Sequence, residues 1–489
     1  MLSIKKLNES GYGKKQGKKI QRELPYFITI ITLLAESGLG PYNICQKIKD
    51  IVDLPIVRLE AIKILKRIDM LGTDPLTALA QAKDRPSSKA LGEFLSGYVS
   101  AIQSGGNVIS YLKSKMTSAY EMLQNEEKQS TEKLSGLVHA YLTMQVVMLA
   151  VFILLSALGT TPLDGYMASP VTAVPSPPPY VMLAFPVIMT AVFLIMANKI
   201  IHSNIQEIEM KKILRFALPP VLVGVVLIFS NLFSGLQANA YILGMSLIAA
   251  SIWPALKFKK IYTTNIDAEE ATPQILRDIT EARKAGIYPE KCIIHACKRA
   301  DYKTFTPIAN SIASKLEWGI PINDIFGTIK NEINNFQVLV IFRILFVVIF
   351  SGGGNVNTLD TLANTSERIY NIEKNKRDML KPYIVVGFMI VVLTGLTSLL
   401  TIDAFSEINQ QKKIGQINPD VAESDALMQA VSASVIIQAW LAGLFIGKIT
   451  RGVYSGGFIF SIFFTAITIL AIAIVQLQII NIGTIFIAS

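Results

Sequence analysis

Charged residues, cysteines and histidines are all scarce in this chain. Only 17% of its 489 residues are Asp, Glu, Lys or Arg, against roughly 25% in an ordinary soluble domain. Three cysteines are too few for a disulfide-built scaffold, and three histidines leave little material for a catalytic or metal-binding cluster. Because 51% of the residues are apolar, the composition excludes a small secreted module, a disordered protein and a single soluble domain. It predicts a protein of the lipid bilayer.

Long apolar runs gather in two regions of the chain. About 20 consecutive apolar residues can cross ~30 Å of hydrocarbon as a helix. No N-terminal signal peptide is expected, because the first such run begins past residue 130. We expect about seven membrane spans with no charged residue in their interiors: Leu137–Leu158, Tyr180–Ala197, Ile213–Ser230, Ala238–Leu256, Pro382–Ile402, Leu427–Gly447 and Phe458–Ile479.

The distribution of Lys and Arg predicts the orientation, because cytoplasmic loops are enriched in them. Residues 1–136 hold 20 basic and 14 acidic residues, and residues 257–381 hold 18 and 14. The loops at 159–179, 231–237 and 403–426 together hold two lysines and six acidic residues. We therefore expect a multi-pass protein of the cell membrane, with its N-terminus and both large polar blocks cytoplasmic and its C-terminus outside. The net charge of +10 then reflects topology, and no nucleic-acid partner is expected.

The two polar blocks have helical patterns. Leu24, Phe27 and Ile31 fall at the spacing of one helix face, and Ile275 and Ile279 do the same in the second block. The predicted fold is therefore all-α, with two helical-bundle domains and a membrane region. The expected divisions are a basic flexible tail at 1–22, domain 1 at 23–136, a four-helix transmembrane region at 137–256, domain 2 at 257–381 and a three-helix transmembrane region at 382–489.

The two blocks repeat one another at an offset of 248 residues. The run 104–108 (Ser-Gly-Gly-Asn-Val) recurs at 352–356 (Gly-Gly-Gly-Asn-Val), and Lys133 and Lys381 each precede a membrane span. Glycine permits φ > 0 where a helix ends, and Asn caps the helix that follows. A phosphate-binding loop is the alternative, but no Lys-Ser/Thr follows and no strand precedes. The predicted repeat turns comprise Gly38, Gly105, Gly106, Asn107, Gly286, Gly353, Gly354 and Asn355.

Residues 338–350 form another apolar run. The run is short for a span and contains Arg343, and a crossing there would invert the charge bias of every later loop. We therefore predict a buried helix of the second bundle.

Duplicated helical blocks, each with these turns and each leading into a membrane span, resemble the type II secretion F domain family. The resemblance covers residues 24–158 and 270–402. It implies a non-enzymatic platform protein of type IV pilus, type II secretion or archaellum machinery, and the additional spans resemble the longer archaeal branch. The implied partners are a hexameric cytoplasmic secretion ATPase, pilin or archaellin subunits, membrane lipids and a second copy of the chain in a homodimer. No cofactor is implied.

Three motifs imitate chemical sites. The run 443–450 resembles a phosphate loop, but its glycine spacing is one residue short and Ile449 follows Lys448 in place of Ser or Thr, so close helix packing is the better interpretation. Cys292, His295 and Cys297 lack a second ligand pair for a metal and are interpreted as a bundle segment with core thiols. Isolated His139 and His202 are expected at membrane boundaries.

Clusters of basic residues are the candidate partner contacts. We predict that the tail contacts the ATPase or anionic lipid headgroups. The alternative interpretation is a solvated, flexible arm that only helps to fix the orientation of the protein in the membrane. The tail's candidates are Lys5, Lys6, Lys14, Lys15, Lys18, Lys19 and Arg22, and further basic clusters are Arg58, Lys63, Lys66 and Arg67, and Lys291, Lys298 and Arg299.

The alternative function is a polytopic transporter or channel with cytoplasmic regulatory domains. Proteins that move ions usually place ionisable residues inside their spans, whereas the interiors of the predicted spans contain no Asp, Glu, Lys or Arg, and Arg215 sits at the edge of one span.

Overall fold

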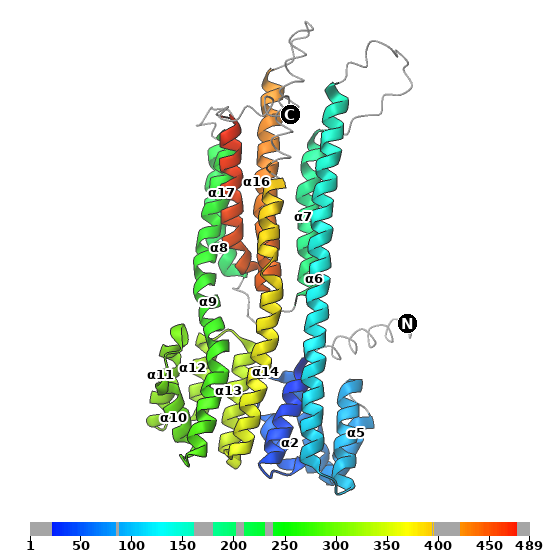
Figure 1. Cartoon of the computed structure of the whole chain (residues 1–489), viewed down its shortest axis with the longest axis vertical. Helices are drawn as coiled ribbons and strands as arrows, with labels where there is room; N and C mark the ends of the chain where they lie inside the picture. The colour runs from blue at the N-terminus through cyan, green and yellow to red at the C-terminus, as the bar shows by residue number, and fades with distance from the viewer. Residues whose placement is uncertain are drawn as a thin grey trace. The chain divides into compact units, whose positions relative to one another are not determined.

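The computed structural model describes residues 22–84, 88–160, 179–201, 210–229, 238–393, 395 and 421–476. Over these ranges the chain is helical and contains no β-strand, as predicted for an all-α protein (Figure 1). The chain divides into two compact units. Unit 1 comprises residues 1–129 and 261–375, and unit 2 comprises residues 130–260 and 376–489. Both polar blocks therefore contribute to one compact unit.

The first block of unit 1 is a run of helices with recognisable start and stop signals. Helices α2 and α3 begin at prolines, whose fixed φ suits the first helical position. Helix α3 ends at Gly72, which has φ +62°. The helices are 22–36, α2 (Pro41–Lys49), α3 (Pro55–Leu71), α4 (Pro75–Asp84), α5 (Lys89–Gln103) and the start of α6 (Val108–Thr160).

The second block has the same order of elements. Its α10 begins at Pro289 and its α14 at Val356, each 248 residues after the start of the corresponding helix in the first block. The elements are the end of α9 (Ala238–Lys284), α10 (Pro289–Arg299), a 3-10 turn η2 (Lys303–Phe305), α11 (Thr306–Glu317), α12 (Ile322–Glu332), α13 (Phe336–Val348), a π turn η3 (Ile349–Gly353) and the start of α14 (Val356–Leu380). This correspondence supports the predicted repeat.

One helix of each block is buried on nearly every side. Residues 23–34 are buried, and α13 has ten buried residues among its thirteen. The Tyr26 ring meets the Phe336 ring edge-on, with ring centroids 5.7 Å apart, and both helices belong to one hydrophobic core. Although Phe336–Gly353 is long and apolar enough for a membrane span, α13 packs inside unit 1, as the sequence predicted for a buried bundle helix.

The corresponding helices at the edges of unit 1 are amphipathic. In α5, Leu91, Phe94 and Leu95 are buried while Lys89 and Glu93 are exposed. In the end of α9, Ile275 and Ile279 are buried, and Arg277 and Glu281 on the opposite side are exposed. Helix 22–36 and α13 are therefore the helices that are buried against both blocks.

Unit 2 contains apolar helices that match the predicted spans in place. Three helical segments of this unit are long and apolar enough to cross a membrane, namely Asn239–Lys284, Ser432–Arg451 and Tyr454–Ala473, and Ala184–Ile200 and Arg215–Leu227 are shorter apolar helices. The total of seven spans stays a prediction. The elements of this unit are the end of α6, α7 (Pro179–Ile200), α8 (Met210–Phe229), the start of α9, the end of α14, residues 383–393, α16 (Val421–Arg451), η4 (Tyr454–Gly456) and α17 (Gly457–Gln476).

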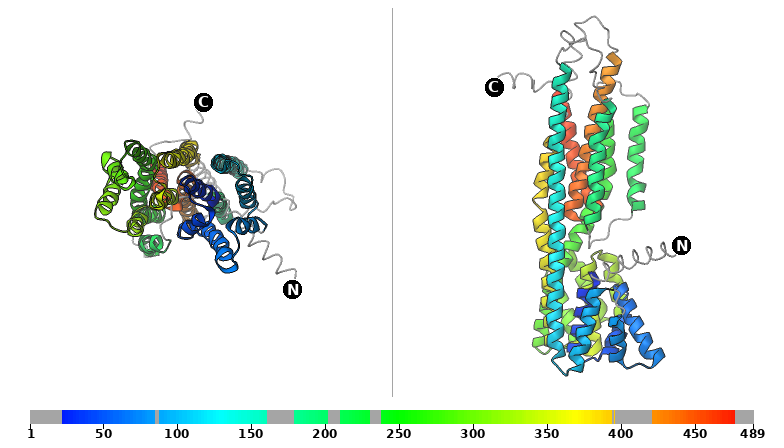
Figure 2. Two further views of the ribbon diagram at one scale, coloured as in Figure 1. Left: turned by 90° about the horizontal axis from the view of Figure 1, so that it is seen from below. Right: turned by 90° about the vertical axis from the view of Figure 1, so that its right-hand side faces the viewer.

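Helix α16 lies against α17 and α7 within unit 2 (Figure 2). Two pairs of polar side chains in this unit bond across helices, an arrangement suited to a bilayer interior that offers no water. Gln438 Nε2 donates to Gln145 Oε1 at 3.1 Å. Trp440 Nε1 donates to Ser251 Oγ at 2.9 Å. These contacts are between neutral groups.

Candidate functional site

The predicted glycine turns at Gly38 and Gly286 have the same backbone geometry. Both residues have φ +86°. The N–H of Leu39 bonds to the carbonyl of Leu34 at 3.0 Å, and the N–H of Ile287 bonds to that of Ala282 at 3.2 Å. A hydrogen bond from the N–H of one residue to the carbonyl five residues earlier is characteristic of the Schellman motif at a helix C-terminus. Both turns therefore have the geometry of helix ends.

The asparagines of the second turn pair are helix caps. Asn107 Oδ1 accepts the Ser110 N–H at 3.0 Å, and Asn355 Oδ1 accepts the Thr358 N–H at 2.8 Å. Each bond satisfies a free N–H in the first turn of α6 or α14. Neither turn adjoins a strand, so the capping geometry agrees with the structural interpretation and not with a phosphate loop.

The glycines of these two turns differ in their surroundings. Positive φ falls on Gly105 in the first turn but on Gly352 in the second, one position earlier in the repeat register. A side chain at Gly353 would collide with Ser37 of the first block, and one at Gly354 would lie 2.5 Å from Pro289. The first turn is exposed instead, and nothing lies within 4 Å of a side chain added at Gly105. The π turn η3 accommodates this packing of the second turn.

A charged contact joins the two blocks inside unit 1. The Asp53 carboxylate accepts from Arg343 Nε at 3.2 Å and from Lys330 Nζ at 3.1 Å. Asp53 and Arg343 are largely buried, and the Arg343 guanidinium stacks 3.6 Å above the Phe326 ring. Arg343, which marked α13 as unsuited to the bilayer, is thus paired across the block interface.

The basic cluster of α3 is engaged in local structural contacts. Lys63 Nζ pairs with the Glu60 carboxylate at 2.7 Å, and Arg58 Nε donates to the Lys49 carbonyl at 2.8 Å. Lys66 is exposed. These contacts leave a dispersed set of cations on α3, so the α3 cluster is a weak candidate for a partner site.

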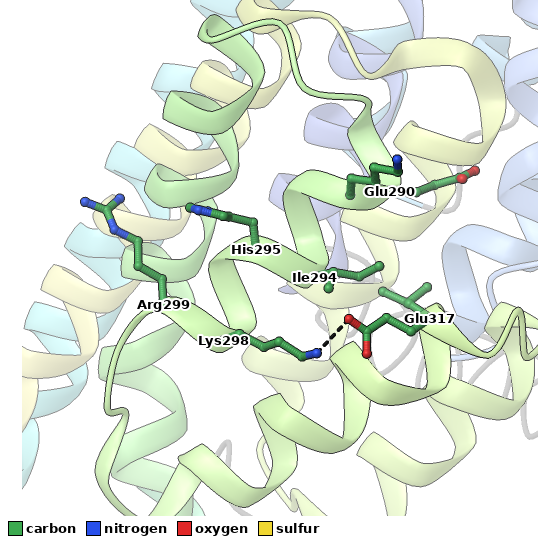
Figure 3. A pocket seen from close by; sticks show the side chains of 8 residues that line it. Glu290, Ile294, His295, Lys298, Arg299 and Glu317 are labelled. Atoms are coloured by element: carbon green, nitrogen blue, oxygen red, sulfur yellow. Dashed lines mark hydrogen bonds and ion pairs between the residues drawn. The ribbon is translucent and has the colours of Figure 1, made fainter.

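The basic cluster of α10 lines a pocket of about 720 Å³ between α10 and α11 (Figure 3). Lys298 reaches across to the Glu317 carboxylate at 2.6 Å, and Arg299 pairs with Asp278 of α9 at 2.8 Å. The pocket is lined by Glu290, Lys291, Ile294, His295, Lys298, Arg299, Leu316 and Glu317.

Helix α10 owes this arrangement to its two faces. Cys292, Ile293, Ala296 and Cys297 are buried in the core of unit 1. Lys291, His295 and Lys298 recur at spacings of four and three residues and are exposed, which places them on one outer face of the helix.

The cysteines of this region belong to the core. Burial raises the pKa of the Cys297 thiol to about 12, and Cys45 of the first block has a pKa raised to about 12 for the same reason. Cys292 Sγ donates to the Ile287 carbonyl at 3.3 Å. His295 is exposed on the opposite face. Within the described residues no group of three or more His, Cys, Asp or Glu side chains could hold a metal ion.

The phosphate-loop imitation at 443–450 is a helix contact. A side chain at Gly443 would meet the Ser461 backbone, and one at Gly447 would meet the Gly457 backbone. These small residues let α16 and α17 approach closely. The structure therefore supports the packing interpretation of this motif.

The remaining candidate residues lie mainly outside the described ranges. The tail lysines Lys5, Lys6, Lys14, Lys15, Lys18 and Lys19 fall there, as does His202. Arg22 begins the described chain. His139 of α6 packs edge-on against Tyr383, with ring centroids 6.4 Å apart, so its role in the described structure is packing.

Two exposed aromatic residues near the lining residues in the sequence were not predicted as candidates. Tyr288 and Trp318 are 75% and 82% exposed. Tyr288 precedes α10, and Trp318 directly follows Glu317 at the end of α11. Neither falls in a motif, and their exposure becomes evident only when the helices are packed.

Apolar helices joined to a compact helical unit define an all-α membrane protein. Residues 27–156 match the family model described as "Type II secretion system (T2SS), protein F". The predicted resemblance to this family is therefore confirmed over residues 27–156.

Comparison with curated proteins finds a distant relative. The chain is 26% identical over 111 residues to an uncharacterized protein of Methanocaldococcus jannaschii, a match that covers 23% of this chain and 18% of the relative. The chain thus spans less than a fifth of the length of that relative. No solved structure matches the chain.

Proposed function

We propose that this protein is the integral membrane platform of a type IV filament machine, an archaellum or an archaeal pilus. The F domain at residues 27–156 carries the proposal. The apolar helices of unit 2 and the shared core of the two polar blocks support it, because a platform needs a membrane anchor and a folded surface for a motor.

In this proposal, unit 1 faces the cytoplasm and docks a hexameric secretion ATPase. The positive charge of both polar blocks supports that orientation. The platform transmits nucleotide-driven motion of the ATPase to pilin or archaellin subunits, which leave the membrane and join the filament. The chain itself acts without catalysis in this scheme, and it works as a homodimer.

Reconstitution tests the docking step. The full-length protein in lipid nanodiscs is expected to retain the purified secretion ATPase of the same organism on a sizing column, and to raise its ATP hydrolysis rate. Nanodiscs without the platform are the control. Absence of any complex at low ionic strength would contradict the proposal.

The basic tail is proposed to strengthen this docking. Deletion of residues 2–22 removes the cluster from Lys5 to Arg22. We expect weaker ATPase binding than wild type at low salt and a smaller difference at high salt, because exposed charges are screened beyond about 10 Å at 0.1 M. Unchanged binding at low salt would assign the tail to orientation alone.

A transporter or channel is the competing function. Flux of ions or small solutes through liposomes containing only the purified protein would favour it. We expect no flux above that of empty liposomes, since the paired polar residues inside unit 2, such as Gln145 and Gln438, are neutral and proton or ion paths usually carry ionisable groups.

A further inference from the structure

We infer that the pocket between α10 and α11 binds an acidic, amphipathic segment of the motor ATPase. This inference rests on the proposed function and locates its docking contact on the second block. Two observations carry it, namely a basic helix face that lines an open pocket and two exposed aromatic residues, Tyr288 and Trp318, that lie close in sequence to the lining residues Glu290 and Glu317.

The cations suit an extended or helical anionic partner. Lys291 and Lys298 are seven residues apart on one face of α10, roughly 10 Å along the helix axis. Lys291 and His295 form no ion pair or hydrogen bond with the described residues of the chain. Acidic side chains spaced three or four residues apart on a partner helix would meet this row at matching intervals.

The pocket also contains carboxylates, which argue against a compact polyanion. Glu290 and Glu317 line it beside the cations, and Lys298 already neutralises Glu317 at 2.6 Å. A phosphate or a lipid headgroup would bring its concentrated charge close to both carboxylates. A peptide can direct its acidic residues toward Lys291 and His295 and avoid the carboxylates, so the lining favours a peptide.

Apolar groups provide the rest of the contact. Ile294 and Leu316 are the apolar residues that line the pocket, and the aromatic side chains of Tyr288 and Trp318 are exposed to solvent. Exposing a Trp side chain forgoes its burial, and Trp and Tyr are the residues that most often dominate binding energy in protein interfaces. We therefore assign an apolar anchor of the partner segment to Ile294 and Leu316, with Tyr288 and Trp318 at its sides.

The first block lacks this site, which makes it an internal control. At the offset of 248 residues, Glu290 corresponds to Tyr42, whose hydroxyl bonds to the Asp69 carboxylate at 3.1 Å. Lys298 and Trp318 correspond to Asp50 and Met70. The cationic row is absent there, so an acidic partner segment should distinguish the two blocks.

Charge reversal in nanodisc-embedded full-length protein tests the site. The double variant Lys291→Glu and Lys298→Glu should weaken binding of the purified ATPase by about tenfold or more at low salt, as expected for loss of close charge pairs. The matched control is Lys89→Glu with Lys284→Glu, which makes the same change in net charge at exposed positions on α5 and α9. The control should change the affinity less than about twofold.

The aromatic contact has its own pair of variants. Trp318→Ala should weaken ATPase binding by about tenfold, whereas Met70→Ala, the exposed residue at the corresponding position of the first block, should leave it unchanged. Both positions are exposed, so neither variant should alter the melting temperature of the protein.

The outcomes separate this inference from the proposed function. If the wild-type protein fails to bind the ATPase at all, the proposed function itself is contradicted. If wild type binds and both the double variant and Trp318→Ala bind equally well, the ATPase docks elsewhere and this site is overturned. If instead the double variant loses binding to vesicles of anionic phospholipid and keeps its affinity for the ATPase, the pocket recognises lipid and the inference is again overturned.

Discussion

Asp53 and Arg343, 290 residues apart in the chain, form an ion pair of 3.2 Å between Oδ2 and Nε within unit 1. The pair connects the segment between α2 and α3 to the middle of α13. Asp53 also accepts from Lys330 of α12, so one carboxylate of the first block contacts two helices of the second. A partly buried pair of this kind stabilises the arrangement of the blocks only while both partners are present.

Removal of the Asp53 carboxylate should therefore be costly. We expect Asp53→Ala to lower the free energy of unfolding of the protein by about 3–5 kcal/mol, because it leaves Arg343 without its carboxylate partner in a largely buried position. Lys330→Ala should cost no more than about 1 kcal/mol, since Lys330 is half exposed. Thermal unfolding in detergent measures both. In the double variant Asp53→Ala with Arg343→Met, part of the loss should be recovered, and full additivity would contradict direct coupling.

The glycine turns should respond alike in the two blocks. Gly38→Ala and Gly286→Ala should each cost about 1–2 kcal/mol, because alanine must adopt φ +86°, while nothing within 4 Å opposes its methyl group. Gly327→Ala, in the middle of α12, is the matched control, with no positive φ and equally open surroundings. It should be neutral or slightly stabilising. A large difference between the Gly38 and Gly286 variants would argue against equivalent turns.

The contact between α16 and α17 should not tolerate larger side chains. Gly447→Val should prevent the close approach to Gly457, and we expect destabilisation of more than about 3 kcal/mol, above the usual cost of overpacking, since backbone atoms oppose the side chain. Gly136→Ala in α6 has open space around it and should be neutral or stabilising. Yield of monodisperse protein and its melting temperature report the effect. Wild-type stability of Gly447→Val would refute the contact.

The buried cysteines should be unreactive in the folded protein. With thiol pKa values of about 12, Cys45 and Cys297 hold roughly one thiolate in ten thousand at pH 8, compared with about one in four for a free cysteine. Alkylation by iodoacetamide should be slow below the raised pKa and complete in denaturant. A cysteine introduced at exposed Ser104 is the positive control. Rapid labelling of native Cys297 at pH 8 would contradict its burial.

Local features of this fold could be predicted from the sequence. The stops at Gly38 and Gly286 and the caps at Asn107 and Asn355 depend on residues within one turn of each other, so the residue types alone indicate the geometry. The burial of α13 was predictable because Arg343 interrupts its apolar run. The helix that packs against α13 was not predictable, because the contact with helix 22–36 joins residues some 300 positions apart.

The candidate docking site shows the limit of such prediction. Lys291, Lys298 and Arg299 were visible as a basic cluster, but a pocket requires a second helix, and α11 supplies Leu316 and Glu317. The cluster on α3 looked equally basic in sequence. Only the packed structure shows that the α10 cluster lines a pocket whose other side comes from α11.

The burial of helix 22–36 and α13 on nearly every side has a consequence for the design of fragments of this protein. Either polar block, expressed as a separate fragment, would expose the hydrophobic surface of its central helix to water and would be prone to aggregate. Such insolubility would result from the absence of the other polar block and not from a defect in the fragment's own sequence. Fragments intended for biophysical study should therefore join residues 22–129 to residues 261–375 through a designed linker, so that each helix keeps its neighbour.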